Sequence, residues 1–320
     1  MLDLIIVGAG PAGLICAIEA KKASLDYVIL EKGLLVNSIY NFPTNMTFFS
    51  TSKKLEVAEI PFISHNEKPT RKEALEYYRR LAHHYDLKIK FQAKVESIKK
   101  DPQHIQVSTP DETYLAKNIV IATGFYDNPR TLDIPGADLS KVKHYFDDAH
   151  PYIGMKVLVV GGANSACDVA LETWSNGAET TMAVRKSGLY EKVKYWILPN
   201  IENRIKEGSI AAYFNTTVAE IRANEVVLNT PDGLKVIEND YVFAMIGYRP
   251  NYDLLKQLGV DYEKNEDLIP SFNPDTFETN VPNVYIAGVI NGGLKTSSLF
   301  IENTRDHGEK IIKNILHTSS

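Results

Sequence analysis

The feature that most constrains this fold is a pattern of strand, glycine turn, helix and strand that occurs twice along the chain. In each copy an apolar run ends at glycines, a segment with helical spacing of apolar residues follows, and a second apolar run closes the unit. The first copy comprises Leu2–Val7, Gly8–Gly10, Leu14–Ala23 and Tyr27–Leu30, and the second Lys156–Val160, Gly161–Ala163, Ala166–Trp174 and Thr180–Val184. Two such βαβ units predict two nucleotide-binding domains in one chain.

Other segments complete the predicted elements. An amphipathic helix is predicted over Lys72–Tyr85 and a strand over Ile89–Ile98. Three short buried strands, each followed by a glycine, are predicted at Ile119–Thr123, Tyr241–Ile246 and Asn283–Ala287.

The order of these segments predicts a discontinuous first domain. Phe125–Gly136 is rich in Pro, Asp, Asn and Gly, and it is typical of a linker. We therefore expect an α/β fold with two Rossmann-like domains. The second domain, residues 125–245, is inserted between the two parts of the first, residues 1–124 and 246–320.

The first glycine loop, Gly8-Ala9-Gly10-Pro11-Ala12-Gly13, is a complete G-x-G-x-x-G pattern. The first glycine of such a loop allows a tight turn, the second lets a pyrophosphate approach the backbone, and the third lets the helix pack close to the strand. Glu31 ends the second strand, where an acid can bind a ribose 2′-hydroxyl. The alternative is a glycine turn in a generic α/β protein.

The second loop is a looser match to the same pattern. It comprises Gly161, Gly162, Ala163, Asn164, Ser165 and Ala166. The strand that follows ends in Val184, Arg185 and Lys186 instead of an acid. Basic residues at this point suit a 2′-phosphate, so we expect NADPH over NADH. The alternative is a solvated pair of charges after a strand.

Composition argues against several classes of function. The net charge of −5 and the pI of about 5.9 disfavour a nucleic-acid binder. The first apolar run is short and lacks a basic segment before it, so neither a signal peptide nor a membrane span is expected. Two cysteines, Cys16 and Cys167, fit a reducing cytosol, and we expect a cytoplasmic protein.

These motifs resemble the flavoproteins of thioredoxin-reductase type over essentially the whole chain. The matching segments are the first loop, "IVIATG" at Ile119–Gly124, the second loop and "NVYIAGV" at Asn283–Val289. A narrower resemblance is to the YpdA-type bacillithiol disulfide reductases. It rests on five segments: Ser38–Ser52, His144–Tyr152, Trp196–Asn200, Asp240–Pro250 and Leu299–Gly308.

The resemblance implies FAD in the first domain, NADPH in the second and hydride transfer from nicotinamide to flavin. It also implies a homo-oligomer. Besides the first loop and Glu31, the expected FAD-binding residues are Lys32, Ser38, Asn41, Val95, Thr123, Gly124, Gly288, Val289 and Ser297. Gly247 joins the second loop, Arg185 and Lys186 in the expected NADPH site. No metal site is expected.

Three departures from the resemblance bear on the chemistry. The broad family ends its C-terminal FAD motif with Gly-Asp, but Val289 follows Gly288 here, as in the YpdA type. Bacillithiol-linked members carry a cysteine in the first glycine loop, where this chain has Ala12. Thioredoxin reductases carry a Cys-x-x-Cys pair before the second loop, but the stretch from Asp148 to Tyr152 has no cysteine.

Candidate catalytic residues are His144, His150 and Tyr40. The two histidines lie where relatives carry the dithiol, and a histidine there could protonate a leaving thiolate. The alternative is a structural histidine held by Asp147 or Asp148. Tyr40 is expected beside the flavin ring by resemblance, with core packing as the alternative.

One further prediction concerns the last helix. Thr296, Ser297 and Ser298 precede the apolar-periodic segment Leu299–Leu316, so Ser297 or Ser298 could cap a helix there. The positive end of that helix would suit the anionic edge of reduced flavin. The alternative is an ordinary capped surface helix.

The electron acceptor stays open among several alternatives. The leading one is a low-molecular-weight disulfide reduced without a protein dithiol. A small redox protein such as ferredoxin is the second, because ferredoxin–NADP reductases of this fold also lack the dithiol. Flavin monooxygenation ranks lower, because Gly136, His144 and Tyr152 have the wrong spacing for its fingerprint. A non-enzymatic sensor ranks low as well, because both glycine loops are present.

Overall fold

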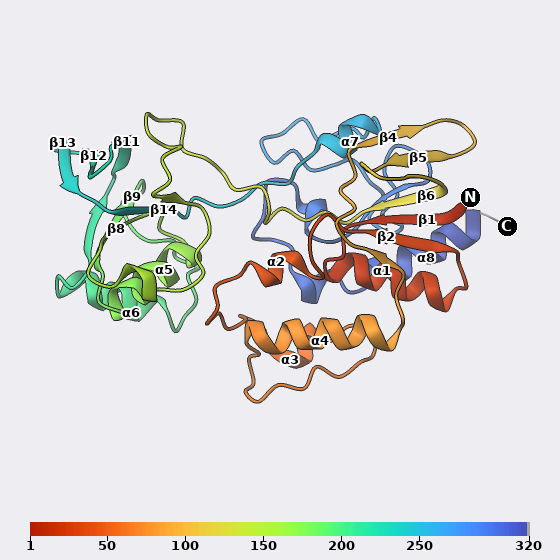
Figure 1. Cartoon of the computed structure of the whole chain (residues 1–320), viewed down its shortest axis with the longest axis horizontal. Coiled ribbons are helices and arrows are strands. Elements are labelled where there is room, and N and C mark those ends of the chain that lie inside the picture. Colours follow the sequence, from red (N-terminus) through yellow and green to blue (C-terminus); the bar gives the residue numbers. More distant parts are fainter. Residues whose placement is uncertain (319–320) are drawn as a thin grey trace. The chain divides into compact units, whose positions relative to one another are not determined.

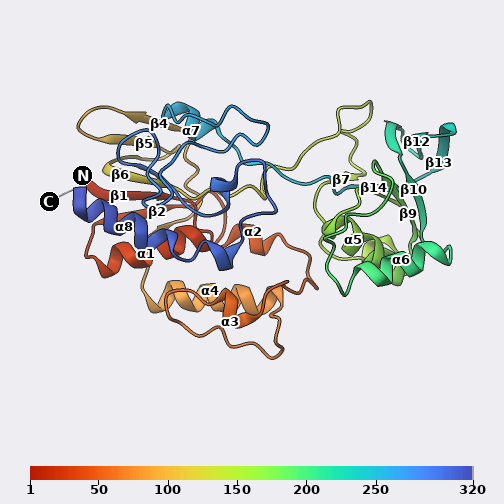
Figure 2. The same ribbon diagram turned by 180° about the vertical axis from the view of Figure 1, so that it is seen from behind.

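The computed structural model describes residues 1–318, which form two compact units (Figures 1 and 2). Unit 1 comprises Met1–Asn41, Met46–Asn128 and the chain from Tyr248 on. Unit 2 comprises Phe42–Asn45 and Pro129–Gly247. Each unit is built around its own parallel sheet with glycines at the strand ends, so the fold is α/β with two Rossmann-like, dinucleotide-binding-type units, as predicted.

Unit 1 contains a seven-stranded sheet in the order β3-β2-β1-β6-β5-β4, with β15 also paired to β6. Its strands are β1 (Leu2–Val7), β2 (Tyr27–Leu30), β3 (Ile89–Lys90), β4 (Ser97–Lys100), β5 (Ile105–Ser108), β6 (Thr113–Ile121) and β15 (Val284–Ile286). Strands β2, β6 and β15 run parallel to β1, with Val7 level with Leu30 and Ile121, and Ile121 level with Ile286. The carboxyl ends of these strands therefore meet at one edge of the sheet.

Helices α1 (Pro11–Lys22) and α8 (His307–Thr318) pack against each other and lie on one face of this sheet (Figures 1 and 2). The other face of the sheet packs against α7 (Asp253–Gln257), through Leu255 and Leu258. The remaining helical elements of unit 1 are α2 (Asn37–Tyr40), α3 (Ser52–Leu55), α4 (Arg71–His84), η2 (Gly288–Gly292) and η3 (Ile301–Asn303). Helix α4 confirms the amphipathic helix predicted over Lys72–Tyr85, and Thr70 and Glu73 form a capping box at its start.

The strand predicted over Ile89–Ile98 is wrong. The chain leaves the sheet after Lys90, turns at Gln92 with a φ of 57°, and re-enters it at Ser97. Strand β3 pairs in parallel with β2, whereas β4 pairs antiparallel with β5. One straight strand could not pair with both β2 and β5, because β3 and β4 lie at opposite edges of the sheet.

The helix predicted over Leu299–Leu316, with its serine cap, is also wrong. The Asn303 side chain accepts a hydrogen bond from the Phe300 amide (2.7 Å) and donates one to the Ser298 carbonyl (3.0 Å). These bonds close a separate turn, η3, and α8 begins only at His307. The Ser298 hydroxyl donates to the Lys295 carbonyl (2.7 Å), and neither Ser297 nor Ser298 caps α8.

Unit 2 contains a parallel sheet in the order β10-β9-β8-β14-β7 and a three-stranded antiparallel sheet. The parallel strands are β7 (Val142–Lys143), β8 (Lys156–Val160), β9 (Glu179–Val184), β10 (Ala211–Phe214) and β14 (Tyr241–Ala244). The antiparallel strands are β11 (Thr217–Ile221), β12 (Glu225–Thr230) and β13 (Gly233–Glu238), and the helices are η1 (His150–Tyr152), α5 (Asn164–Ser175) and α6 (Leu198–Lys206). Helix α5 packs on β8, β9 and α6.

Candidate functional site

The first glycine loop joins β1 to α1 with almost no space between strand and helix. A Cβ atom added to Gly13 would lie 2.0 Å from the Gly8 carbonyl oxygen, so only glycine fits there. A Cβ added to Gly10 would meet nothing within 4 Å. The loop therefore presents open backbone at the start of α1, where a helix N-terminus favours an anion.

Glu31 stabilises this loop from the end of β2. Its carboxylate accepts hydrogen bonds from the amides of Ala9 (2.7 Å) and Gly33 (2.7 Å), and the residue is 6% exposed. Each carboxylate oxygen keeps a second lone pair that could accept a ribose hydroxyl. The neighbouring Lys32 forms an ion pair with Asp127.

Two other predicted segments meet the first loop at the same edge of the sheet. A Cβ on Gly288, whose φ is +82°, would lie 2.7 Å from the Ala12 Cβ, and one on Gly124 would lie 3.9 Å from a methyl of Val289. The Thr123 hydroxyl is buried and has no hydrogen-bond partner within the described part of the chain. An unpartnered hydroxyl beside bare glycine backbone fits a bound dinucleotide that supplies acceptors and donors.

Helix α2 carries the residues expected beside the flavin ring. The Val36 amide, just before α2, donates to the Ala9 carbonyl (3.0 Å), which ties this helix to the first loop. The Asn41 side chain donates to the Asn37 carbonyl (2.7 Å), and Ser38 lies on the same short helix. Tyr40 is 48% exposed and carries the Arg71 guanidinium over its ring, so it is not a core residue.

Val95 lies in the segment between β3 and β4. Its side chain belongs to the buried cluster that includes Val28 and Leu30, so only its backbone could contact a cofactor. The nearby Ala93 amide donates to the Glu31 carbonyl (2.9 Å), which places this segment beside the end of β2. Ser297 is exposed.

The second loop, in unit 2, joins β8 to α5. Ala163 and Ser165 are exposed at its surface, whereas Ala166 is fully buried. The Asn164 side chain accepts from the Lys194 amide (2.8 Å), which fixes the start of α5.

Arg185, Lys186 and Gly247 are exposed and lie at the same sheet edge as the second loop. Arg185 and Lys186 directly follow β9, and Gly247 follows β14. Val160, at the end of β8, is level with Ala183 in β9 and Ala244 in β14. The residues expected to bind the second nucleotide are therefore brought together within unit 2.

The two histidines proposed as proton donors differ in exposure. His144 is half-buried, and burial lowers its pKa below the usual histidine value. His150 is exposed at the start of η1, and Asp148 accepts a hydrogen bond from its backbone amide (2.8 Å), not from its ring. Both histidines belong to unit 2, whereas Tyr40 belongs to unit 1.

Neither cysteine is accessible. Cys16 on α1 and Cys167 on α5 are both 0% exposed and both free. Burial raises the pKa of each thiol to about 12. Because the thiolate is the reactive form, neither residue is suited to attack a disulfide.

A residue that sequence reasoning missed lies next to this site. His307, at the start of α8, accepts a hydrogen bond from the Gly288 amide on Nδ1 (3.1 Å) and is buried. Its only sequence signal was a histidine within an otherwise apolar-periodic segment.

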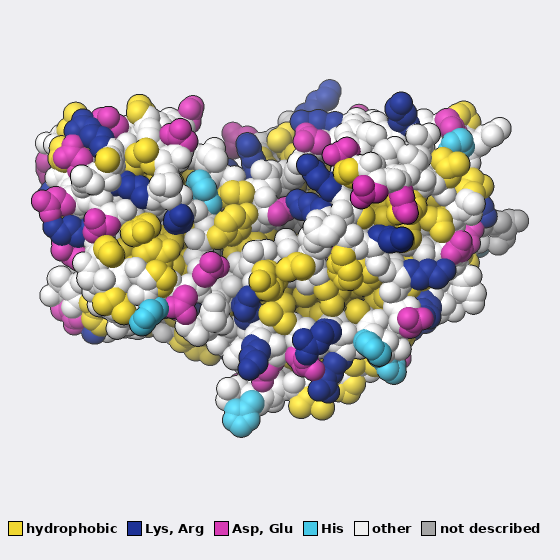
Figure 3. All heavy atoms as spheres, in the orientation of Figure 1, with side chains coloured by type: hydrophobic (Ala, Val, Ile, Leu, Met, Phe, Trp, Pro, Cys, Tyr) yellow, Lys and Arg dark blue, Asp and Glu magenta, His cyan; other side chains and the backbone are white. Residues whose placement is uncertain are grey.

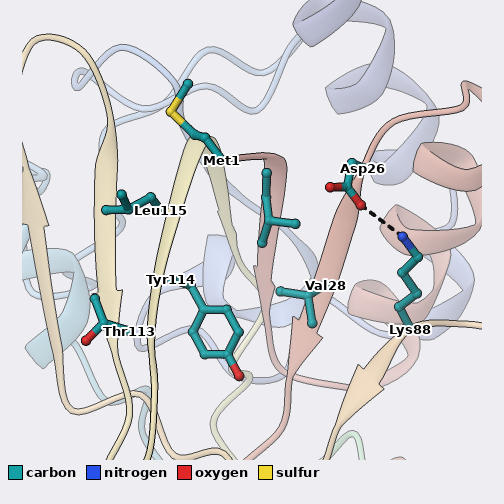
Figure 4. Close-up of a pocket in the computed structure, with 8 residues that line it drawn as sticks. Met1, Asp26, Val28, Lys88, Thr113, Tyr114 and Leu115 are labelled. Atoms are coloured by element: carbon teal, nitrogen blue, oxygen red, sulfur yellow. Dashed lines mark hydrogen bonds and ion pairs between the residues drawn. The ribbon is translucent and has the colours of Figure 1, made fainter.

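A shallow pocket of about 450 Å³ lies elsewhere on unit 1 (Figure 4). Leu2, Val28 and Tyr114 are among its lining residues, and Asp26 and Lys88, which also line it, form an ion pair (2.9 Å). These residues lie at or near the amino ends of their strands. Open α/β sheets bind ligands at the carboxyl ends, so we assign no cofactor to this pocket.

Surface charge, metal binding and membrane spans are further signs of ligands or partners. The face drawn in Figure 3 mixes acidic and basic side chains over much of its surface. Within residues 1–318, no cluster of three His, Cys, Asp or Glu side chains could hold a metal ion. Over the same residues, no helix has the length and apolar character needed to cross a membrane.

Comparison with known proteins agrees with this architecture. Residues 5–288 match the family model described as pyridine nucleotide-disulphide oxidoreductase. The chain is 43% identical over 313 residues to bacilliredoxin reductase Bdr of Bacillus subtilis, covering 97% of this chain and 96% of that protein. It is 26% identical over 302 residues to a ferredoxin–NADP reductase of Ignicoccus hospitalis, covering 91% and 90%.

A solved structure gives the same result. The bacillithiol disulfide reductase Bdr (YpdA) of Staphylococcus aureus superimposes with a TM-score of 0.96 at 42% identity, covering 100% of this chain and 99% of that one. The chain therefore belongs to the pyridine nucleotide-disulphide oxidoreductases, flavoprotein enzymes that use FAD and NAD(P)H, and it is similar over its full length to bacillithiol disulfide reductases.

Proposed function

We propose that this enzyme reduces a low-molecular-weight disulfide of the bacillithiol disulfide type, with NADPH as the reductant and without a thiol of its own. The overall reaction is NADPH + H⁺ + RSSR → NADP⁺ + 2 RSH. One observation carries this proposal: a chain similar over its full length to bacillithiol disulfide reductases has only two cysteines, both fully buried.

FAD is assigned to unit 1, where, when bound, it supplies the relay of two electrons between the nicotinamide and the acceptor. The first loop would bind the pyrophosphate with the amides at the start of α1, and Glu31 would accept from the ribose. The Thr123 hydroxyl, Gly124, Gly288 and Val289 line the same edge and would hold the rest of the cofactor. Lys32, Ser38, Asn41 and the Val95 backbone are assigned to its surroundings, and the exposed Ser297 keeps no role as a helix cap.

NADPH is assigned to unit 2. The open backbone at Ala163 and Ser165 would bind the pyrophosphate, with Gly247 at the adjacent strand end. Arg185 and Lys186 are two exposed cations at the end of β9. A 2′-phosphate, which NADPH has and NADH lacks, would bind at this position. We choose NADPH for that reason.

Reduction of the disulfide releases two thiols, and the second to leave, as a thiolate, needs a proton. His150 is the better of the two histidine candidates for donating it. Its imidazole is exposed, whereas burial lowers the pKa of His144 and disfavours its charged form. Tyr40 is the third candidate, as an exposed aromatic on a helix tied to the first loop.

A second candidate function is ferredoxin reduction. The buried cysteines favour it equally, because one-electron transfer to an iron–sulfur protein needs no thiol. The similarity to the ferredoxin–NADP reductase of Ignicoccus hospitalis also supports it. The net charge of −5 counts against it, because electrostatic complementarity to an acidic ferredoxin calls for a basic partner.

The test is anaerobic consumption of NADPH by the purified protein, with bacillithiol disulfide and ferredoxin offered in parallel. Turnover with the disulfide and release of free thiol supports the first proposal. Turnover with ferredoxin alone overturns it in favour of the second. The same assay with NADH in place of NADPH tests the choice of nucleotide.

We also propose that the protein is cytosolic, because its two cysteines are free and free thiols persist in a reducing compartment. A homo-oligomer is proposed by analogy alone, and size-exclusion chromatography with light scattering tests it.

A further inference from the structure

His307 occupies an unusual position for a histidine in this chain. It is the first residue of α8 and is 4% exposed. Helix α8 packs beside α1 (Figures 1 and 2). The next residue, Gly308, is so close to α1 that an added Cβ would lie 3.0 Å from the Cys16 amide nitrogen. His307 therefore directly precedes the point where α8 lies closest to α1.

The hydrogen bond of His307 defines its protonation state. The Gly288 amide donates to Nδ1 (3.1 Å), so Nδ1 carries no proton and the neutral ring carries its proton on Nε2. Burial lowers the pKa of His307 to about 4, which keeps the ring neutral near pH 7. The imidazole thus serves as a fixed acceptor for one backbone amide.

A strained loop holds the ring of His307 in place. The Phe277 ring stacks on it, with centroids 3.9 Å apart and an interplanar angle of 20°. Phe277 has a φ of 60°, an unfavourable backbone conformation for an aromatic residue. Its carbonyl accepts from the Ile286 amide (3.1 Å), two residues before Gly288. The loop that carries Phe277 therefore contacts both the His307 ring and the strand that leads to the Gly288–Val289 turn.

The amide that His307 holds belongs to the turn that closes on the first glycine loop. Gly288 and Ala12 are in such close contact that no Cβ fits on Gly288, and Val289 reaches toward Gly124. Because Val289 has no carboxylate, this turn can offer a cofactor only backbone groups and a methyl surface. The orientation of its peptide bonds then decides what it can bind.

We propose that His307 is a positioning residue of the FAD site, which acts by holding the Gly288–Val289 turn against Ala12 of the first glycine loop. The inference rests on the assignment of FAD to unit 1. It predicts that the acceptor at Nδ1, and not only the bulk of the ring, sets the affinity for FAD.

Two substitutions separate the acceptor from the ring. His307→Phe keeps an aromatic ring against Phe277 and removes the acceptor, whereas His307→Asn removes the ring and retains an oxygen close to the position of Nδ1. The Kd of the apoprotein for FAD, measured by flavin fluorescence, is the main measurement. The visible spectrum of bound flavin and the Tm of the apoprotein accompany it. His317→Phe, at an exposed position of the same helix, is the matched control.

We expect His307→Phe to weaken FAD binding about tenfold, because a buried amide loses its partner. His307→Asn should stay within about threefold of the wild type, and His317→Phe should not change the Kd. Equal Kd values for the Phe and Asn variants, or a Phe variant that binds FAD as the wild type does, would overturn the proposal.

A third variant keeps the test decisive if His307→Phe does not fold. His307→Gln places its oxygen near Nε2, so it should weaken FAD binding while His307→Asn does not. Equal Kd values for FAD in His307→Gln and His307→Asn would overturn the positioning role. A wild-type apoprotein that binds no FAD overturns the cofactor assignment itself, which is a different result from failure of the variants.

Discussion

The two glycine loops have the same place in their sheets but differ in how closely helix approaches strand. In unit 1 a Cβ on Gly13 would lie 2.0 Å from the Gly8 carbonyl oxygen, so the third glycine is obligatory. In unit 2 Ala166 occupies the same place, and its methyl is buried without such an overlap. The comparison teaches that the third glycine is required by the separation of helix and strand, and not by nucleotide binding itself.

The ends of the second strands differ as well. The buried Glu31 side chain accepts hydrogen bonds from the Ala9 amide in the first glycine loop and from the Gly33 amide after β2, whereas Arg185 and Lys186 are exposed. In unit 1 the charge at this point stabilises the loop. In unit 2 the two charges are exposed, so they are accessible to the 2′-phosphate that we propose as their ligand. We therefore expect these similar positions to have different roles in the two repeats, and substitutions can test this.

The largest effect is expected from Gly13→Ala. Its methyl group would overlap the Gly8 carbonyl oxygen, so α1 must shift and the start of the helix must leave its place at the loop. We expect FAD affinity to fall about 100-fold or more, as for strain of about 3 kcal/mol. Binding of FAD to the apoprotein checks this expectation.

Ala166→Gly is the matched substitution in the second loop. It removes a buried methyl without strain, so the KM for NADPH should change by less than about threefold. Near-normal FAD affinity of Gly13→Ala, or a large effect of Ala166→Gly, would break the comparison.

The second effect is a pH dependence of unit 1 that arises from His307. Its folded-state pKa, about 4, lies below the ordinary value of 6.5. As pH falls from about 6.5 toward 4, the unfolded chain binds a proton that the buried ring does not. The contribution of the neutral His307 ring to stability is therefore complete above about pH 6.5. The free energy of unfolding should decrease by about 2 kcal/mol between pH 7 and pH 5.

Urea unfolding of the wild type and of His307→Asn at pH 7 and pH 5 measures this difference. Asp306 and Lys310 flank the ring with opposite effects on its pKa, and both remain in the variant. His317→Asn should retain the wild-type slope. An unchanged slope in His307→Asn would assign the pH dependence to another group.

Much of the fold could be predicted from local pattern alone. The apolar runs predicted β1, β2 and β8 to the residue, because a buried parallel strand is a continuous apolar run with polar residues or glycines at its ends. The start of α8 could not be predicted in this way. The Asn303 side chain closes a turn before it, and such a side-chain bond leaves no periodic signal.

The candidate site was predictable to a different degree. Glycine loops and the basic residues after β9 have a sequence pattern, and the structure brings them to the carboxyl ends of their sheets. His307 has no such sequence pattern, because its role depends on a hydrogen bond to Gly288, which lies 19 residues earlier in the chain. The inward turn of Glu31 was also unpredictable, because either strand-end orientation satisfies the same motif. The roles of His144 and His150 stay predictions.

The third effect concerns the charges after β9. The double variant Arg185→Ala/Lys186→Ala should raise the KM for NADPH about 30-fold and leave the KM for NADH within about twofold, because only NADPH carries the 2′-phosphate. Lys206→Ala, an exposed cation at the end of α6, is the control. An equal loss for both nucleotides would mean that these residues do not contact the 2′-phosphate.

The smallest effect is expected where the two repeats are alike. Each unit buries one cysteine on the helix after its glycine loop, and burial raises the pKa of both thiols to about 12. The cysteine-free variant Cys16→Ala/Cys167→Ala should lose about 1 kcal/mol of stability per site and keep disulfide turnover within about twofold. Anaerobic NADPH consumption with bacillithiol disulfide measures it. If the variant still bound FAD and oxidised NADPH but no longer reduced the disulfide, a buried thiol would have to open during turnover. The two repeats would then differ in the role of their buried cysteines, although both cysteines have the same burial in this structure.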